Sequence, residues 1–189
     1  MANTSRPNGA SLVGTLDGSP VSGGIRERDV AAGNATAIFA GDFMILNDDG
    51  TVSPYTGTGG GNLLGVCMGV VVNRAVAATE HPGYLPASTA GVVLVAEGPQ
   101  YLYEVQVNGT ALDATAIGSN ANVKATAGST TTGMSRHELD ATTLTDSSPA
   151  SAQLRVIEMS KRVDNEVGST YDKVIVKINK HIHMDATGL

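Results

Sequence analysis

The sequence predicts an all-β fold, a barrel or sandwich-like domain with an extended N-terminal arm. Three stretches predict it. The apolar run at 63–72 is too short to cross a bilayer and too rich in glycine and valine to favour a helix, so we expect a strand buried on both faces. A second such run follows at 91–97. Residues 101–107 then alternate tyrosine and valine with Leu, Glu and Gln, the period of a strand with one buried face.

The composition indicates one domain with a thin core. A chain of 189 residues can bury a sizeable core, but aromatic residues make up only 4% and there is no tryptophan. Alanine and valine therefore supply most of the apolar side chains, and each buries little area at roughly 25 cal/mol per Å². We expect additional burial against other subunits.

Charge and cysteine content narrow the classes of function. The net charge is −6 with few, scattered basic residues, which argues against a nucleic-acid surface. The single cysteine, Cys67, lies in an apolar run and is interpreted as an inert core residue. No signal peptide or membrane-spanning run is recognisable, so we expect a soluble protein made in a cytosol, without a membrane partner.

Residues 1–29 are interpreted as the extended arm and residues 30–189 as the β-rich domain. Glycine and proline interrupt the first segment too often for a helix or a long strand. Its few large apolar residues, Leu12, Val13, Leu16 and Ile25, would contact a partner along which the arm is laid; a floppy terminus is the alternative. We expect the domain to fold without residues 2–29.

The next segment carries the strongest turn signal. Short apolar runs at 37–39, 43–46 and 51–55 predict strands, and Asp49-Gly50 between the last two predicts a tight hairpin. The glycine-rich stretch 56–62 lacks the lysine, the spacing and the following helix of a phosphate-binding loop, and is interpreted as a surface loop.

Later segments alternate between loops and strands. The two prolines in 80–86 predict a bend that cannot pair in a sheet, and His81 beside Glu80 is interpreted as structural rather than catalytic. We expect one helical turn within 111–117, a short strand at 122–126 and a long polar loop at 137–150.

Two strands, at 152–159 and 171–179, close the domain around a turn at 163–169. His181 and His183 follow, two residues apart, which on a strand places both rings on one face. They are weak candidates for metal ligands because no further ligands have a recognisable spacing. A solvated or interface tail is the favoured interpretation.

Several stretches, in this order, resemble the head decoration, or cement, proteins of tailed bacteriophages: VAAGNATAIFAGDFMIL, DDGTVSP, NLLGVCMGVVV, HPGYLPAS, AGVVLVAEGPQYLYEVQV and VIVKINKH. The similarity covers roughly residues 30–180. It implies a β-rich, barrel-like domain that binds the outside of the icosahedral capsid where major capsid subunits meet, often as a trimer. It implies no catalytic residues.

The expected function is therefore that of a viral structural protein without catalysis or cofactors. It would be made in the host cytoplasm and bound to the capsid exterior, with the major capsid protein and further copies of itself as partners. One alternative is a carbohydrate- or host-surface-binding module, whose aromatic contacts could come from Tyr55, Tyr84, Tyr101, Tyr103 and Tyr171. Another is a tail or shell subunit. A hydrolase is least expected because no nucleophile motif is present.

Overall fold

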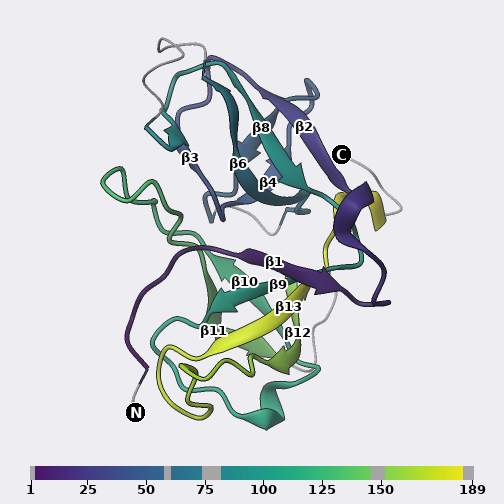
Figure 1. Ribbon diagram of the computed structural model, residues 1–189, viewed down its shortest axis with the longest axis vertical. Coiled ribbons are helices and arrows are strands. Elements are labelled where there is room, and N and C mark those ends of the chain that lie inside the picture. Colours follow the sequence, from purple (N-terminus) through teal and green to yellow (C-terminus); the bar gives the residue numbers. More distant parts are fainter. Residues whose placement is uncertain (1–2, 58–60, 74–81, 146–151, 185–189) are drawn as a thin grey trace.

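The computed structural model describes residues 3–57, 61–73, 82–145 and 152–184 and shows an all-β protein, as the sequence predicts. Two antiparallel sheets lie one above the other along the long axis (Figure 1). The helical elements of the described ranges are three short 3-10 turns, η1 (Val21–Gly23), η2 (Ala114–Ala116) and η3 (Ile182–Met184). None of these turns has the length or the apolar character to cross a membrane.

The lower half is a six-stranded sheet that curls on itself. Its strand order is β1 (Ser11–Thr15), β9 (Tyr101–Gln106), β13 (Lys173–Ile178), β12 (Leu154–Met159), β10 (Asn120–Lys124) and β11 (Glu138–Thr145). Tyr103 lies opposite Val176 in the ladder of β9 and β13, and both are fully buried. An isolated bridge between Val107 and Leu139 brings β11 back to the end of β9. This half is therefore barrel-like.

The upper half is a five-stranded sheet with a small two-stranded sheet beside it. Its order is β2 (Ile25–Val30), β8 (Gly91–Ala96), β6 (Gly65–Asn73), β4 (Phe43–Leu46) and β5 (Val52–Pro54), and the small sheet pairs β3 (Ile38–Phe39) with β7 (Tyr84–Leu85). The predicted hairpin joins β4 and β5. Gly50 has a φ of 81° and donates its N–H to the Asn47 carbonyl at 2.9 Å.

Burial of β6 differs from the expectation. Val66 and Cys67 are buried, but Met68 and Val71 expose more than a third of their surface. Two register shifts interrupt the pairing of β6 with β8, and each shift changes the direction of the following side chains. Only the first part of the strand is therefore buried on both faces.

The two halves share one hydrophobic core. Phe43, Val66 and Ala96 of the upper sheet belong to the same cluster of buried side chains as Tyr103 and Val176 of the lower sheet. The rings of Phe43 and Tyr103 meet edge to face with centroids 6.3 Å apart. A second cluster, which includes Ile38, Met44 and Val95, lies within the upper half. The chain is therefore one packed unit.

Residues 180–182, near the end of the described chain, connect the lower half to the upper half by hydrogen bonds. After β13, Lys180 accepts a hydrogen bond from the N–H of Leu63 at 2.8 Å, and Ile182 donates its N–H to the Leu63 carbonyl at 3.0 Å. The Ile182 side chain is buried in the upper cluster. The segment with His181 and His183 is thus part of the fold up to residue 184, rather than a solvated tail.

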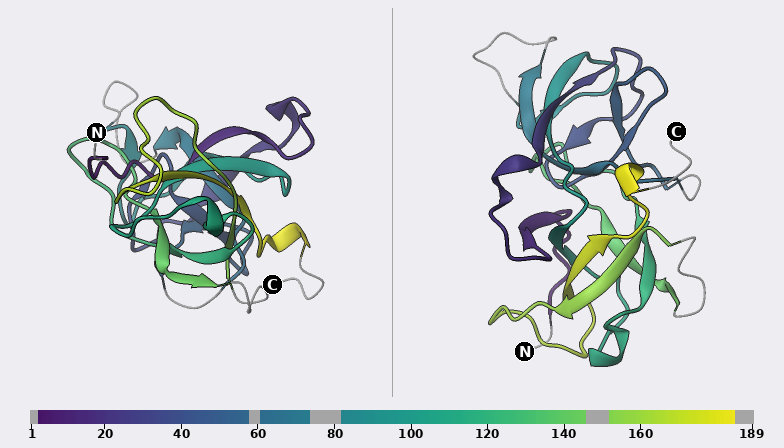
Figure 2. Two further views of the ribbon diagram at one scale, coloured as in Figure 1. Left: turned by 90° about the horizontal axis from the view of Figure 1, so that it is seen from below. Right: turned by 90° about the vertical axis from the view of Figure 1, so that its right-hand side faces the viewer.

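The extended N-terminal arm is not confirmed. Ser11–Thr15 pairs with β9, and Ile25–Val30 pairs with β8 along its whole length. Figure 2 shows this segment running along one side of the molecule from the lower sheet to the upper one. Residues 11–30 therefore form edge strands of both halves instead of reaching away from the domain.

Two predicted loops contain strands, and one predicted turn has a cap. Tyr84–Leu85 pairs with β3 although prolines flank it, and Glu138–Thr145 forms β11 where a polar loop was expected. Prolines outside the two paired positions cost no ladder hydrogen bond. The expected helical turn is η2, and Asp113 caps it by accepting a hydrogen bond from the Thr115 N–H at 2.8 Å. Glu80 and His81 lie outside the described residues.

Candidate functional site

The N-terminal edge strands and the turn after β1 carry three of the exposed apolar residues. Val13, Leu16 and Ile25 are 51%, 48% and 39% exposed. Leu12, on the same strand as Val13, instead packs against the lower core. The structure therefore leaves three of the four predicted interface residues available for contact and assigns Leu12 to the fold.

The connection between β1 and β2 is fixed by a buried tyrosine. The Tyr101 hydroxyl donates to the Val21 carbonyl at 2.7 Å and accepts the Gly24 N–H at 2.8 Å. Next to it, the Leu16 N–H donates to the Gln100 carbonyl at 2.8 Å. Because these bonds hold the backbone at both ends of the connection, Leu16 and Ile25 are presented on an ordered surface.

Charged side chains alternate along β2. Arg28 makes two hydrogen bonds to the buried carboxylate of Glu97, at 2.9 and 2.8 Å, and Arg26 lies 3.0 Å from the same group. Glu27 and Asp29 are exposed. An arginine that makes two hydrogen bonds to one carboxylate forms one of the stronger charged contacts in proteins. Glu97 therefore adds side-chain contacts to the backbone hydrogen bonds that hold β2 against β8.

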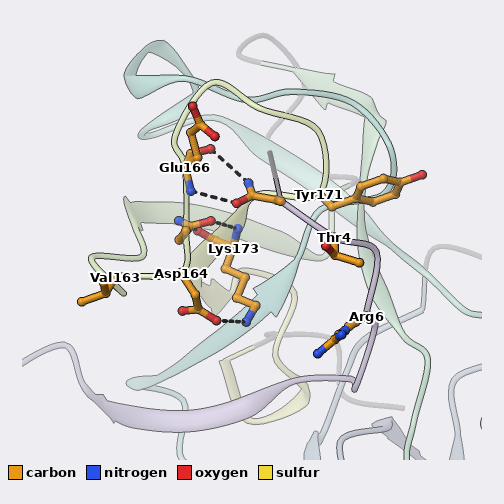
Figure 3. Close-up of a pocket in the computed structure, with 9 residues that line it drawn as sticks. Thr4, Arg6, Val163, Asp164, Glu166, Tyr171 and Lys173 are labelled. Atoms are coloured by element: carbon orange, nitrogen blue, oxygen red, sulfur yellow. Dashed lines mark hydrogen bonds and ion pairs between the residues drawn. The ribbon is translucent and has the colours of Figure 1, made fainter. Parts of the chain in front are cut away.

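A cleft of about 400 Å³ opens where the N-terminal residues cross the loop between β12 and β13 (Figure 3). Asn3 closes one side: its Nδ2 donates to the Glu166 carbonyl at 3.0 Å, and its Oδ1 accepts the Glu166 N–H at 2.8 Å. Asn165 bonds both backbone groups of Lys173, at 3.0 and 2.8 Å. These amide groups are used internally and shape the cleft.

Two cations face this cleft. Lys173 and Arg6 extend to the same side of it (Figure 3). The Lys173 ammonium lies 3.4 Å from Asp164, whose pKa the neighbouring Arg162 side chain lowers to about 2. Within the described ranges the Arg6 guanidinium has no ion-pair partner. The cleft can attract an anion, but solvent screens such open charges strongly and gives little specificity.

A second, smaller cleft of about 180 Å³ lies between the two halves. Pro54 and Tyr55 of the upper half and residues 125–128 of the lower half form its walls, and Asp42 and His137 also line it. Both residues are almost fully buried, whereas Thr56, Thr126 and Ala127 are exposed and Thr36 is half-buried. The buried residues therefore form the floor of the cleft and the exposed ones its rim.

Burial is the main cause of the pKa shifts of both Asp42 and His137. Desolvation raises the pKa of Asp42 to about 6, although the Ser135 hydroxyl and the Phe39 N–H favour the charged form. Burial lowers the pKa of His137 to about 4. His137 Nδ1 accepts the Phe43 N–H at 3.1 Å, so the proton of the neutral ring is on Nε2, 3.6 Å from Asp42 Oδ1.

The two candidate metal ligands lie side by side but in different surroundings. His181 is buried, its Nδ1 accepts the His183 N–H at 3.2 Å, and burial lowers its pKa to about 4. His183 is exposed, with its ring centroid 5.3 Å from that of His181. In the part of the chain that the structure describes, no three His, Cys, Asp or Glu side chains gather as metal ligands.

The tyrosines are mostly internal. Tyr55, Tyr101 and Tyr103 are buried, and Tyr84 stacks on Phe39 with centroids 4.9 Å apart. Of the five, Tyr171 alone lines the larger cleft. A flat aromatic platform for sugars is therefore not formed by these five side chains.

Sequence reasoning missed the floor of the smaller cleft. Asp42 lies between two predicted strands and His137 at the start of a predicted loop, and no spacing rule connects them. What brings them together is the bridge between Ala40 and Met134 and the bond from the Ser135 N–H to the Ala40 carbonyl, at 3.1 Å.

Comparison of the chain with models of known protein families, with curated protein sequences and with solved structures gives no match.

Proposed function

We propose that this chain is a viral structural protein that binds the outer surface of an icosahedral phage capsid and stabilises contacts between major capsid subunits, without catalysis. The sequence resemblance motivates the proposal. The observation that supports it is the exposed apolar group Val13, Leu16 and Ile25, on two edge strands and the ordered turn after β1. Exposed apolar residues held on a rigid backbone favour contact with another protein, because little conformational entropy is lost on binding.

The charges of β2 argue against a two-fold pair of copies through this edge strand. In an antiparallel pair related by a two-fold axis, a central residue i faces its own copy, and residue i−1 faces residue i+1 of the other copy. For β2 this brings either Glu27 to Glu27 with Arg26 opposite Arg28, or Arg28 to Arg28 with Glu27 opposite Asp29. Like charges directly opposite destabilise a pair. The trimer that the sequence resemblance implies, in which two different surfaces meet, remains the proposed assembly.

Weak contacts suffice for a protein of this kind. A capsid offers many equivalent sites, and linked copies bind together with far higher avidity than one copy alone. The exposed apolar group is small for a stable one-to-one complex, which buries about 800 Å² per partner. Attachment would therefore depend on several copies that hold neighbouring capsid subunits at once.

The proposal can be tested with phage capsids that carry no decoration protein. The double variant Val13→Ser/Leu16→Ser should reduce occupancy on such particles about tenfold or more, as measured by co-sedimentation and imaging. A matched control is Val163→Ser/Val167→Ser, which removes two exposed valines from the β12–β13 loop. Light scattering should give the mass of a trimer in solution. Unchanged occupancy of the double variant, or no binding of the unmodified protein, would overturn the proposal.

One observation keeps a glycan-binding role as a second candidate. Tyr171 lines the larger cleft together with Arg6 and Lys173, and an aromatic ring beside hydrogen-bond donors can hold a sugar. Saturable binding on a glycan array, lost in Tyr171→Ala and kept in Val13→Ser/Leu16→Ser, would favour this function over capsid decoration. Self-assembly of the purified protein into tubes or shells would favour a tail or shell subunit.

A further inference from the structure

The smaller cleft ends on a carboxylate with one oxygen that makes no hydrogen bond among the described residues. Asp42 is 2% exposed and its Oδ2 accepts the Phe39 N–H at 2.8 Å. Its Oδ1 is buried and has no hydrogen-bond partner among the described residues. A buried polar atom without a partner is rare in folded proteins because its desolvation is not compensated, and it indicates that water, an ion or another ligand supplies the missing contact.

No cation of the described chain neutralises this carboxylate. His137 is the nearest titratable group; its Nε2 lies 3.6 Å from Oδ1, beyond hydrogen-bond length, and burial lowers the pKa of the ring to about 4. Cys67 donates its backbone N–H to the Asp42 carbonyl at 2.8 Å, and burial raises the pKa of its thiol to about 12, so it stays uncharged. Ser135 offers a neutral hydroxyl. Above pH 6 the carboxylate on the floor therefore carries a negative charge that no cation of the described residues balances.

The walls of the cleft suit an alkyl chain. Pro54, Tyr55 and Ala125 line it, and the exposed Thr56 and Thr126 lie at its rim. Its volume of about 180 Å³ is several times the ~30 Å³ that one water molecule occupies in the liquid. A ligand that fills it has an apolar body and a cationic end with hydrogen donors.

We propose that this cleft binds a primary ammonium group on an alkyl chain, the chemistry of a lysine side chain, with the ammonium beside the Asp42 carboxylate on the floor of the cleft. A compact charge with three N–H donors can serve a carboxylate through one oxygen, whereas the fork of a guanidinium pairs best with both oxygens, and Oδ2 already accepts the Phe39 N–H. The four-carbon stem of lysine lies along apolar walls while its end is charged. Because both halves form the cleft, the bound chain would contact the upper and the lower sheet at once.

This inference does not rest on the proposed function, because a small amine tests it directly. The probe is n-butylammonium chloride, titrated into isotopically labelled protein at pH 7.5 and followed by NMR at the His137 ring and the amides of Thr36 and Thr126. We expect saturable shifts at these residues. n-Butanol and tetramethylammonium, which lack the charge or the N–H donors, should cause shifts at least tenfold weaker.

Two variants separate the carboxylate from the cleft. Asp42→Asn removes the charge at constant size, and Ala127→Phe places a ring at the exposed rim while Asp42 stays in place. Each should weaken n-butylammonium binding about tenfold or more, whereas Ala111→Phe, on an exposed site outside the cleft, should not. Lowering the pH from 7.5 to 5 should weaken binding about tenfold, because a carboxyl with a pKa of about 6 is then mostly protonated.

Equal binding of n-butanol, or unchanged affinity in both Asp42→Asn and Ala127→Phe, would overturn the inference and leave water as the partner of Oδ1. Competition on undecorated particles then distinguishes the source of the amine. If n-butylammonium, but not tetramethylammonium, releases the bound protein, the group is a lysine of the particle. If the amine binds the cleft without releasing it, a free alkylamine is the ligand, and the capsid proposal stands or falls on its own variants.

Discussion

Tyr101 holds Gly24 through a hydrogen bond of 2.8 Å from the Gly24 N–H to its phenolic oxygen. The same hydroxyl donates to the Val21 carbonyl, so one buried side chain of the lower sheet fixes the start of the upper edge strand. The protein's N-terminal segment is ordered by contacts of this kind, and not by its own sequence preferences.

Tyr101→Phe should lower the free energy of unfolding by about 1 kcal/mol, because it leaves two partly buried backbone groups without their partner. Urea denaturation measures the loss, and hydrogen exchange should become faster at residues 16–24. Tyr84→Phe is the matched control, since Tyr84 contributes ring stacking on Phe39 that phenylalanine preserves. Equal effects of the two substitutions would contradict the anchoring role of the Tyr101 hydroxyl.

Deletion of residues 2–29 should prevent cooperative folding, contrary to the expectation from sequence that the domain folds without them. The deletion removes β1 and β2, uncovers the backbone of β8 and β9, and takes the buried Ala10 from the core. Thermal denaturation followed by circular dichroism, with gel filtration for aggregates, would show this. A truncated protein with a sharp transition and a monomer's elution volume would restore the arm interpretation.

Asp42 and His137 should give opposite pH dependence to stability. The folded pKa of Asp42, about 6, lies above the ordinary value of 3.8, so its contribution is fully present below pH 4 and is lost as the pH rises through 6. The folded pKa of His137, about 4, lies below 6.5, so its contribution is present above pH 6.5 and is lost as the pH falls through 4. In the unmodified protein these two slopes oppose each other, and His181, whose pKa burial also lowers to about 4, adds a second rise of stability with pH.

Single substitutions should therefore reveal each slope. Relative to the unmodified protein, Asp42→Asn should make the free energy of unfolding rise by about 2–3 kcal/mol more between pH 4 and 6.5, since two pKa units are worth about 2.7 kcal/mol. Relative to the same reference, His137→Asn, whose side-chain oxygen can still accept the Phe43 N–H, should make it rise by about 2–3 kcal/mol less. Urea denaturation at several pH values checks both, and differences of the same sign would contradict the assignment.

Gly65→Ala should be strongly destabilising, by about 2 kcal/mol or more, because a Cβ at this position would overlap the Ala96 carbonyl oxygen, a backbone atom that cannot turn aside. Gly14→Ala is the control: nothing lies within 4 Å of a Cβ there, so the change should be close to neutral. Thermal denaturation of both variants decides. Comparable stabilities would show that β6 can move away from β8.

The sequence predicts the fold class and the central strands because their side chains carry the signal themselves. The tyrosine and valine alternation at 101–107 and the β-branched run before Asn179 identify β9 and β13, and Asp49-Gly50 identifies the hairpin. These features depend on neighbours within a few residues, where pattern rules apply.

The edge strands could not be predicted in this way. Ser11–Thr15 has no alternation of its own and becomes a strand because β9, distant in the sequence, offers a free edge. In β11, Leu139 and Ala141 are buried, but threonine and aspartate around them resemble a loop. Pairing to distant strands overrides weak local preference.

The candidate sites show the same limit. Val13, Leu16 and Ile25 are exposed and so remain available for the predicted contact. Leu12 turns inward because adjacent residues of a strand face opposite sides. Asp42 and His137 meet only through the tertiary fold, and the unpartnered Oδ1 atom has no trace in the sequence.

Within the described residues, the chain passes between the upper and lower halves at three places: between β1 and β2, between β8 and β9, and after β13. A pull applied to either end of such a molecule is shared by several backbone connections in parallel, so the halves cannot swing apart like a hinge. The protein should therefore behave as one rigid body under mechanical load. This property would suit a protein attached to a shell that is under internal pressure.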